Sequence, residues 1–411
     1  MSAMWGGVSR GALILCAAAG GAPALAQSGA APARQITIGV TGQATYDSNT
    51  PQSGAIFAEA RGLEREDVRF TPAVTIDAVI PIGRQTLSLG GSVGYDFYAR
   101  NTQLNSERIG LDAAAGLKLA GCDVGLSAGY SRRQTALGDF FILGPVTPDG
   151  VQADNVEDIK TVGANATCGD AIGIRPTASV SHTWVDNSNA FRTLSDSRSL
   201  SARAGVSYAR PAFGSLSLFG SYARATYPGR DEIGLAGADS FETYGAGVRF
   251  SRDIGSRLRG VAEVSYTSAD SGQDDVDDFS GITWSLQLTA DVTDRLQGSF
   301  DVSRAIQPSN RIDATYSVTQ SYGANFSYAL GPRVQLTASA LYRDRDLRGA
   351  VLLGGFGITE DELTSFSAGA RYQLNRRFSL NANVARESRR TNNEFFDYDS
   401  TRVSAGFAAT F

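Results

Sequence analysis

The chain has 411 residues, a formal net charge of −5 and a mean hydropathy of −0.14. The acidic balance disfavours nucleic-acid binding, and beyond the N-terminal segment no apolar run approaches the roughly 20 residues of a transmembrane helix, which excludes a helical membrane protein. A membrane β-barrel stays possible at this hydropathy, because a barrel shows lipid only one face of each strand.

The N-terminus predicts a secretory signal peptide spanning residues 1–26. Arg10 precedes an apolar run at 11–19, and Ala24-Leu25-Ala26 supplies the small residues of a cleavage site. We expect export through the signal-peptide pathway, with residues 27–411 forming a single outer-membrane β-barrel domain.

The rest of the chain is a series of hairpins in which short and long connections alternate. The short ones carry Gly, Pro, Asn or Asp and lie at 81–84, 120–121, 169–171, 211–214, 253–256, 293–294, 331–332 and 375–376. The long ones lie around 48–66, 100–107, 134–157, 187–197, 228–240, 270–279, 306–312, 347–361 and 391–398. Short periplasmic turns and long outer loops are typical of outer-membrane barrels, so we predict about eighteen antiparallel strands, with sixteen as the alternative.

Within the predicted strands, apolar residues occupy every second position. Leu87, Leu89 and Val93, for example, alternate with Thr86 and Ser88. A water-soluble sandwich or propeller would also alternate, but its strands average about half of the roughly 12 residues found here. We therefore predict an all-β, transmembrane, up-and-down barrel.

The opposite strand faces carry charges of both signs. Their members are Arg69, Asp77, Asp96, Asp112, Asp123, Arg133, Arg175, Arg203, Arg249, Arg259, Glu263, Asp291, Asp301, Arg343, Arg371, Arg389 and Arg402. A barrel of about eighteen strands is too wide for side chains to fill, so these residues are pore-lining candidates. They could select solutes by charge, or they could pair across strands and only keep the wall wetted.

The longest loop, at 134–157, contains the apolar stretch 140–146. Exposing such a stretch to water is costly, so we expect this third outer loop to pack against something. Folded inward, it would constrict the pore, with Asp139, Asp149 and Asp154 facing the arginine-bearing wall and Phe140 and Phe141 beside them. Packing on the barrel rim or on lipopolysaccharide is the alternative.

Cys122 opens one predicted strand and Cys168 closes the next, both at the periplasmic end of one hairpin. Directly opposed strand residues have Cα atoms about 4.5 to 5.5 Å apart, which is compatible with a disulfide. We predict this disulfide, with two free thiols as the alternative.

Enzymatic chemistry finds little support. His182 is the only histidine, and it lies on the apolar parity beside Trp184, where it cannot act as a base for a lumenal nucleophile. The acidic loop 270–278 lacks the spacing of a calcium loop. We expect no catalytic residues, no cofactor and no metal.

The C-terminal strand predicts how the barrel assembles and closes. Ser404, Gly406, Ala409 and Phe411 resemble the terminal signal that bacterial barrel assembly machinery recognises, although an aromatic is usual at the position of Ala409. With both termini in the periplasm, this strand can pair with the first, Gln35 to Asp47, and close the sheet.

Short motifs in the first strands resemble the family called putative beta-barrel porin 2. Members usually carry Tyr-Asp-Asp-Asn where this chain has Tyr46-Asp47-Ser48-Asn49, and a Ser-Pro or Thr-Pro step as at Thr71-Pro72. The resemblance implies a bacterial outer-membrane barrel, often encoded beside exopolysaccharide synthesis and export genes. Pro72 removes one ladder hydrogen bond, which predicts a bulge or local fraying.

Two hypotheses for function follow. The first is a porin-like passive channel for polar solutes, linked to exopolysaccharide export. The alternative is a structural barrel that is closed by its third loop and binds polysaccharide or a partner through its outer loops. The expected partners are outer-membrane lipid and lipopolysaccharide, the barrel assembly machinery, and exopolysaccharide or export components.

Overall fold

The computed structural model describes residues 34–135, 137–139, 154–190, 192–231, 240–272, 278–309, 311, 314–349 and 358–411. Ala31–Phe411 forms one compact unit. The predicted signal peptide lies outside the described residues. Among the helices of the described ranges, none combines the length and the apolarity needed to cross a membrane.

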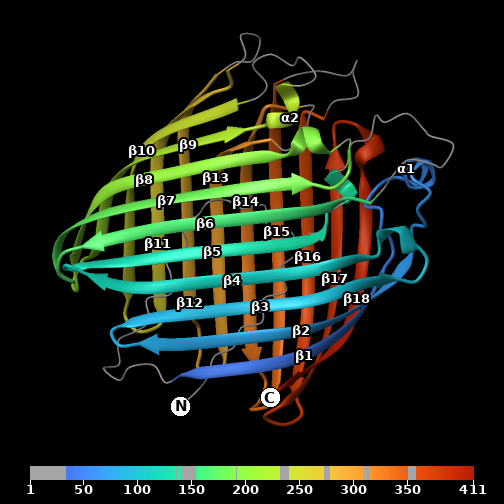
Figure 1. Cartoon of the computed structure of the whole chain (residues 1–411), viewed down its shortest axis with the longest axis horizontal. Coiled ribbons are helices and arrows are strands. Elements are labelled where there is room, and N and C mark those ends of the chain that lie inside the picture. Colours follow the sequence, from blue (N-terminus) through green and yellow to red (C-terminus); the bar gives the residue numbers. More distant parts are fainter. Residues whose placement is uncertain are drawn as a thin grey trace. The chain divides into compact units, whose positions relative to one another are not determined.

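Eighteen antiparallel strands form a single sheet, and strands that follow one another in the chain lie side by side (Figure 1). They are β1 Gln35–Asp47, β2 Asp67–Ile82, β3 Gln85–Tyr98, β4 Ser106–Leu119, β5 Cys122–Gln134, β6 Val156–Cys168, β7 Gly173–Asn187, β8 Ser197–Arg210, β9 Gly214–Thr226, β10 Ser240–Ile254, β11 Leu258–Asp270, β12 Phe279–Asp291, β13 Leu296–Pro308, β14 Tyr316–Ala329, β15 Val334–Arg348, β16 Glu360–Gln373, β17 Phe378–Thr391 and β18 Tyr398–Thr410. The long connections carry α1 Ala55–Ala60, α2 Pro228–Asp231 and the 3-10 helices η1 Thr102–Leu104, η2 Leu137–Asp139, η3 Thr193–Ser195 and η4 Glu394–Phe396.

The sheet closes on itself where the first and last strands meet. β1 pairs with β2 on one edge and with β18 on the other, in a register that runs from Gly39↔Thr410 to Asp47↔Arg402. Closure satisfies the backbone groups that an open edge would expose to lipid. The predicted fold, strand number and closing pair are confirmed.

The Tyr46–Asn49 motif fastens this closure at its loop end. Ser48 N donates to Thr401 O at 3.0 Å, and Thr401 N donates to Ser48 Oγ at 2.8 Å. Asp47 Oδ1 accepts from Asn49 N and from Ser400 Oγ, while Asn49 Nδ2 donates to Asp399 O. The short polar side chains of the motif therefore hold β1 to β18 just beyond the ladder.

Alternation along each strand gives the wall two unlike faces. Val40, Val74 and Val93 face one another across three neighbouring strands, and they are 41%, 53% and 54% exposed. Side chains of this kind form a continuous apolar exterior, which is unfavourable in water and favourable against lipid. The charged residues predicted to line the pore lie on the opposite, inward face, whereas other charged side chains, such as Arg132, Asp158 and Lys160, share the outward face toward the loop ends of their strands.

Pro72 interrupts a ladder without shifting it. β2 pairs with β3 at Phe70↔Phe97 and again at Ala73↔Gly94, in one unbroken register with a gap between these pairs. On the other edge Pro72 pairs with Gly42 of β1. The local fraying predicted from the missing N–H is present, and the alternative of a bulge is wrong.

Candidate functional site: the lumen and its outer mouth

Every charged residue predicted to line the pore lies on the strand face opposite the exposed apolar side chains. Several are paired: Arg69 with Asp96 at 3.7 Å, Arg133 with Glu157 at 3.5 Å, Arg203 and Arg249 with Glu263 at 2.8 and 3.3 Å, Arg259 with Asp253 at 2.7 Å, Arg402 with Glu387 at 2.7 Å, and Asp123 with Lys118 at 2.6 Å. Arg371 donates to Ser379 Oγ at 3.4 Å. Within the described ranges no ion pair involves Asp77, Asp112, Asp291, Asp301 or Arg175. The wall therefore combines locally neutralised pairs with inward carboxylates that have no cationic partner among the described residues.

The start of the third loop lies inside the mouth. Leu137, in η2, is 4% exposed and packs with Leu63 and Leu104 from the first two loops. Gly138 O accepts a hydrogen bond from Arg389 Nη1 at 2.5 Å. Arg389 faces inward on β17, which is separated from β5 by β4, β3, β2, β1 and β18, so the chain leaves the wall after β5 and crosses the mouth.

The predicted constriction residues lie mostly beyond this anchor. Phe140, Phe141 and Asp149 fall outside the described residues, as does the side chain of Asp139. Asp154 lies where the chain rejoins the wall before β6, and its carbonyl oxygen accepts from Asn189 Nδ2 at 3.0 Å. What the structure describes is the two ends of the loop, of which the first is held inward.

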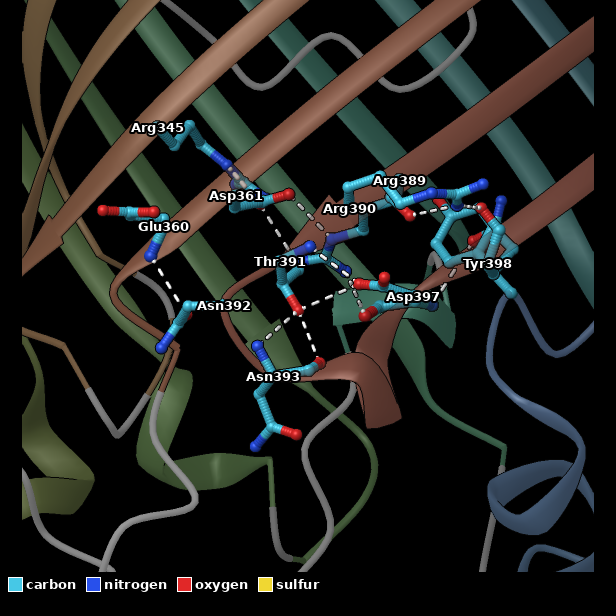
Figure 2. Close-up of polar contacts among 12 residues, drawn as sticks. Arg345, Glu360, Asp361, Arg389, Arg390, Thr391, Asn392, Asn393, Asp397 and Tyr398 are labelled. Atoms are coloured by element: carbon cyan, nitrogen blue, oxygen red, sulfur yellow. Dashed lines mark hydrogen bonds and ion pairs between the residues drawn. The ribbon is translucent and has the colours of Figure 1, made fainter.

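A buried carboxylate orients the arginine that holds the loop. Figure 2 shows Arg345 of β15 and Arg389 of β17 converging on Asp361 of β16. Arg389 Nε and Nη2 lie 2.9 and 3.0 Å from Asp361 Oδ1 and Oδ2, and Arg345 Nε lies 2.8 Å from Oδ2. The three side chains are 2%, 9% and 0% exposed, in the order Arg389, Arg345, Asp361. Such two-pronged contacts fix the plane of a guanidinium and leave its remaining N–H groups aimed at other acceptors.

Two further arginines join loops that are distant in sequence. Arg61 Nη1 donates to Leu137 O at 3.2 Å. Burial lowers the pKa of Arg61 to about 10, and the nearby positive charge of Arg192 adds to this shift. Arg230, within α2, donates to Leu194 O at 3.1 Å and to Ser309 O at 3.2 Å. Guanidinium groups suit this role because they offer several donors in one plane.

Apolar contacts complete the mouth. Ala314, Leu347, Ile358 and Phe396 form a buried cluster between the ends of three hairpins. Figure 2 shows how the last loop is shaped beside it: Thr391 N and Thr391 Oγ1 donate to Asp397 Oδ1 and Asn393 O, at 2.7 and 2.6 Å. We call Arg61, Leu137, Gly138, Arg345, Asp361 and Arg389 the mouth network.

Sequence reasoning found only part of this network. Strand parity places Arg389 inward from the sequence, and the same parity places Arg345 and Asp361 inward, although neither is among the pore-lining candidates above. Arg61 lies in a connection without periodicity, so no local pattern marks it. Its role depends on Leu137, a residue from another loop.

Other predicted sites have plain structural settings. Cys122 and Cys168 are directly opposed in the β5–β6 ladder, and their sulfur atoms form a disulfide. The ring of His182 lies 4.0 Å from that of Trp184, centroid to centroid, on the outward parity. No cluster of His, Cys, Asp and Glu able to hold a metal occurs among the described residues.

Gly406 and Phe411 both serve the closing pair of strands. A Cβ at Gly406 would lie 2.7 Å from Gly42 O, so a larger residue would push β18 away from β1. Phe411 N donates to Ile38 O at 2.8 Å. These contacts give the two residues a structural role in addition to any recognition during assembly.

Comparison with known proteins agrees with this architecture. Residues 238–411 match the family model described as Putative beta-barrel porin 2, which agrees with the resemblance drawn above from motifs in the first strands. None of the curated proteins matches the chain. A BenF-like porin from Pseudomonas fluorescens Pf-5 is 12% identical, with 92% of this chain and 99% of that chain covered and a TM-score of 0.50.

Two other solved barrels are similar over the same extent. OccK2 (OpdF) from Pseudomonas aeruginosa is 10% identical, with coverage of 92% of this chain and 98% of that chain and a TM-score of 0.47. OccAB3 from Acinetobacter baumannii is 9% identical, with coverage of 92% and 99% and a TM-score of 0.47. At these identities the likeness to the BenF-like porin concerns the fold alone.

Proposed function

We propose that this chain, whose residues 238–411 match the porin family above, is an outer-membrane channel for polar solutes whose mouth is narrowed by its own third loop. The observation that carries the proposal is the closed eighteen-stranded wall with an apolar exterior and a charged inward face. Barrels with sixteen to eighteen strands are wide enough to leave an aqueous lumen. A polar solute would therefore meet hydrogen-bonding groups along its whole path.

A role in exopolysaccharide export is the finer part of this proposal. It is supported by the family resemblance and by the chemistry of the inward face, where hydroxyl, carboxylate and guanidinium groups can bond to sugar hydroxyls. Deleting the gene and measuring secreted polysaccharide tests it. Unchanged secretion of polysaccharide by the deletion strain would refute the role in exopolysaccharide export, but not the channel itself.

Conductance of the purified full-length barrel in planar bilayers tests the channel itself. We expect discrete current steps that grow with salt concentration. A variant in which 140–153 is replaced by a short Gly-Ser linker keeps the anchor at Leu137 and Gly138 and should give larger steps. No steps from either protein across several salts would refute an open lumen.

A second candidate is a closed barrel that acts through its outer loops. The mouth network and Arg230 favour it, because the buried arginines Arg61, Arg389 and Arg230 donate hydrogen bonds to carbonyl oxygens of several loops. Here the native protein would stay silent in bilayers, and labelled polysaccharide would bind to intact cells. Recordings of the native protein separate the two candidates, since a channel conducts and a barrel closed by its third loop stays silent. In the second case the linker variant should conduct, because it lacks the loop residues that close the lumen.

A further inference from the structure

Four residues on neighbouring strands form a compact group on the inward face. Arg203 lies on β8, Phe219 on β9, Arg249 on β10 and Glu263 on β11. Arg203 Nη2 lies 2.8 Å from Glu263 Oε1 and its Nη1 lies 3.0 Å from Oε2. Arg249 Nη1 lies 3.3 Å from the same Oε2. We call these residues the arginine station.

The backbone around the station is shaped for its aromatic member. Phe219 is 8% exposed although it faces the lumen. A Cβ at Gly205 would lie 3.0 Å from Phe219 Cα and 2.3 Å from Leu218 O, and one at Gly247 would lie 2.8 Å from Phe219 Cζ. Glycine on both neighbouring strands therefore lets the ring lie close against the wall.

The ring in turn positions a guanidinium. The Cζ atom of Arg203 lies 4.0 Å from the Phe219 ring centroid, which is a cation–π contact. With one face on the ring and two donors on Glu263, Arg203 has little rotational freedom left to lose when a solute binds. Preorganisation of this kind strengthens binding without adding contacts.

The charges of the station do not balance. Two guanidinium groups share one carboxylate, which leaves a net positive charge, whereas Arg402–Glu387, Arg133–Glu157 and Lys118–Asp123 match one cation with one anion. The side chains of Arg203 and Arg249 remain 29% and 33% exposed, so water-borne anions can reach them. Arg249 uses one terminal nitrogen on Glu263 and keeps other donors.

Hydroxyl groups surround these donors. In the strand registers, Ser217 is opposite Arg249, Ser221 is opposite Arg203 and Ser265 is opposite Gly247, all on the inward parity. A guanidinium that can take a carboxylate in a two-pronged manner, next to a row of hydroxyls, matches a sugar that carries a carboxylate.

We propose that the arginine station is a binding site for carboxylate-bearing sugars inside the lumen. This rests on the proposed function, since the sugar must enter the barrel. Binding happens through Arg249 and the free edge of Arg203, while Glu263 weakens it by competing for the same donors. Removing that carboxylate should therefore strengthen binding, an effect opposite to the one expected if Glu263 only stabilised the wall.

Calorimetric titration of the detergent-solubilised full chain tests the proposal, with galacturonate as the probe and galactose as its neutral counterpart. We expect galacturonate to bind more tightly than galactose, Glu263→Gln to strengthen galacturonate binding about fivefold, and Arg249→Gln to weaken it about fivefold. Arg259→Gln is the control, since Arg259 is also inward but pairs with Asp253 at the periplasmic end and is 66% exposed. Each variant must run as a folded barrel on unheated gels.

The proposed binding site would be refuted if the two sugars bound equally well. It would also be refuted if Arg249→Gln and Arg259→Gln weakened galacturonate binding to the same degree. If Glu263→Gln fails to fold, the comparison of Arg249→Gln with Arg259→Gln still decides. Conductance of the same samples is recorded separately. If galacturonate binds but no current steps appear, the proposed channel is refuted and the proposed binding site stands. If current steps appear but galacturonate binds no better than galactose, the binding site is refuted and the channel stands.

Discussion

Replacing Arg389 with glutamine should release the start of the third loop and widen the mouth. The side chain is 2% exposed, and it donates to Gly138 O at 2.5 Å and to both oxygens of Asp361. A hydrogen bond from a charged donor contributes about 1.5 to 3 kcal/mol. Its loss therefore lowers the ratio of anchored to released loop roughly ten- to hundredfold.

The same substitution should cost stability without unfolding the barrel. Removing one partner of a buried ion pair costs about 3 to 5 kcal/mol when the other charge is left alone. Asp361 keeps Arg345, so we expect a loss near the lower end of this range.

Single-channel recording and liposome swelling measure the effect on the mouth. We expect larger or longer-lived open states and faster solute entry than in the native protein. Arg371→Gln is the matched control, because Arg371 also faces inward on neighbouring β16 but bonds to Ser379 Oγ. If Arg389→Gln runs as a folded barrel and conducts like the native protein and the control, the anchor does not limit the mouth.

Three further outcomes follow from the structure. Leu137→Ala should empty part of a cluster in which Leu137 is 4% exposed, at a cost of about 2 to 3 kcal/mol, and so raise conductance; unchanged recordings would speak against an apolar anchor. Gly205→Ala should lower the urea concentration at which half of the protein is unfolded, because its Cβ would lie 2.3 Å from a backbone oxygen. Gly116→Ala is the control and should leave this midpoint unchanged, because a Cβ there would have no atom within 4 Å. Equal midpoints for the two variants would contradict this reasoning. Changing Cys122 and Cys168 together to serine removes the cross-link between two positions 46 residues apart in sequence, and should lower the free energy of unfolding by up to about 4 kcal/mol. Alkylation of both thiols in unreduced native protein would disprove the disulfide.

The strands, their number and their closure could be predicted from the sequence because these features are local. Period-2 alternation and turn residues identify each strand and its inward face, and in an up-and-down barrel each strand pairs with its neighbour in the chain. The sequence predicts the first strand at Gln35 to Asp47, and β1 has these bounds in the structure. The inward position of Arg389 followed from the same parity.

The mouth could not be predicted in this way, because its contacts join residues that no periodic pattern relates. Gly138 and Arg389 are 251 positions apart, and Arg61 meets Leu137 from a different loop. Loops satisfy their backbone carbonyls with whatever donors the closed barrel brings near, so their partners exist only after the wall has formed. The sequence by itself determined a closed barrel with a charged interior. Only the tertiary structure decided that a buried carboxylate aims Arg389 at the third loop, and that Glu263 holds two arginines beside Phe219.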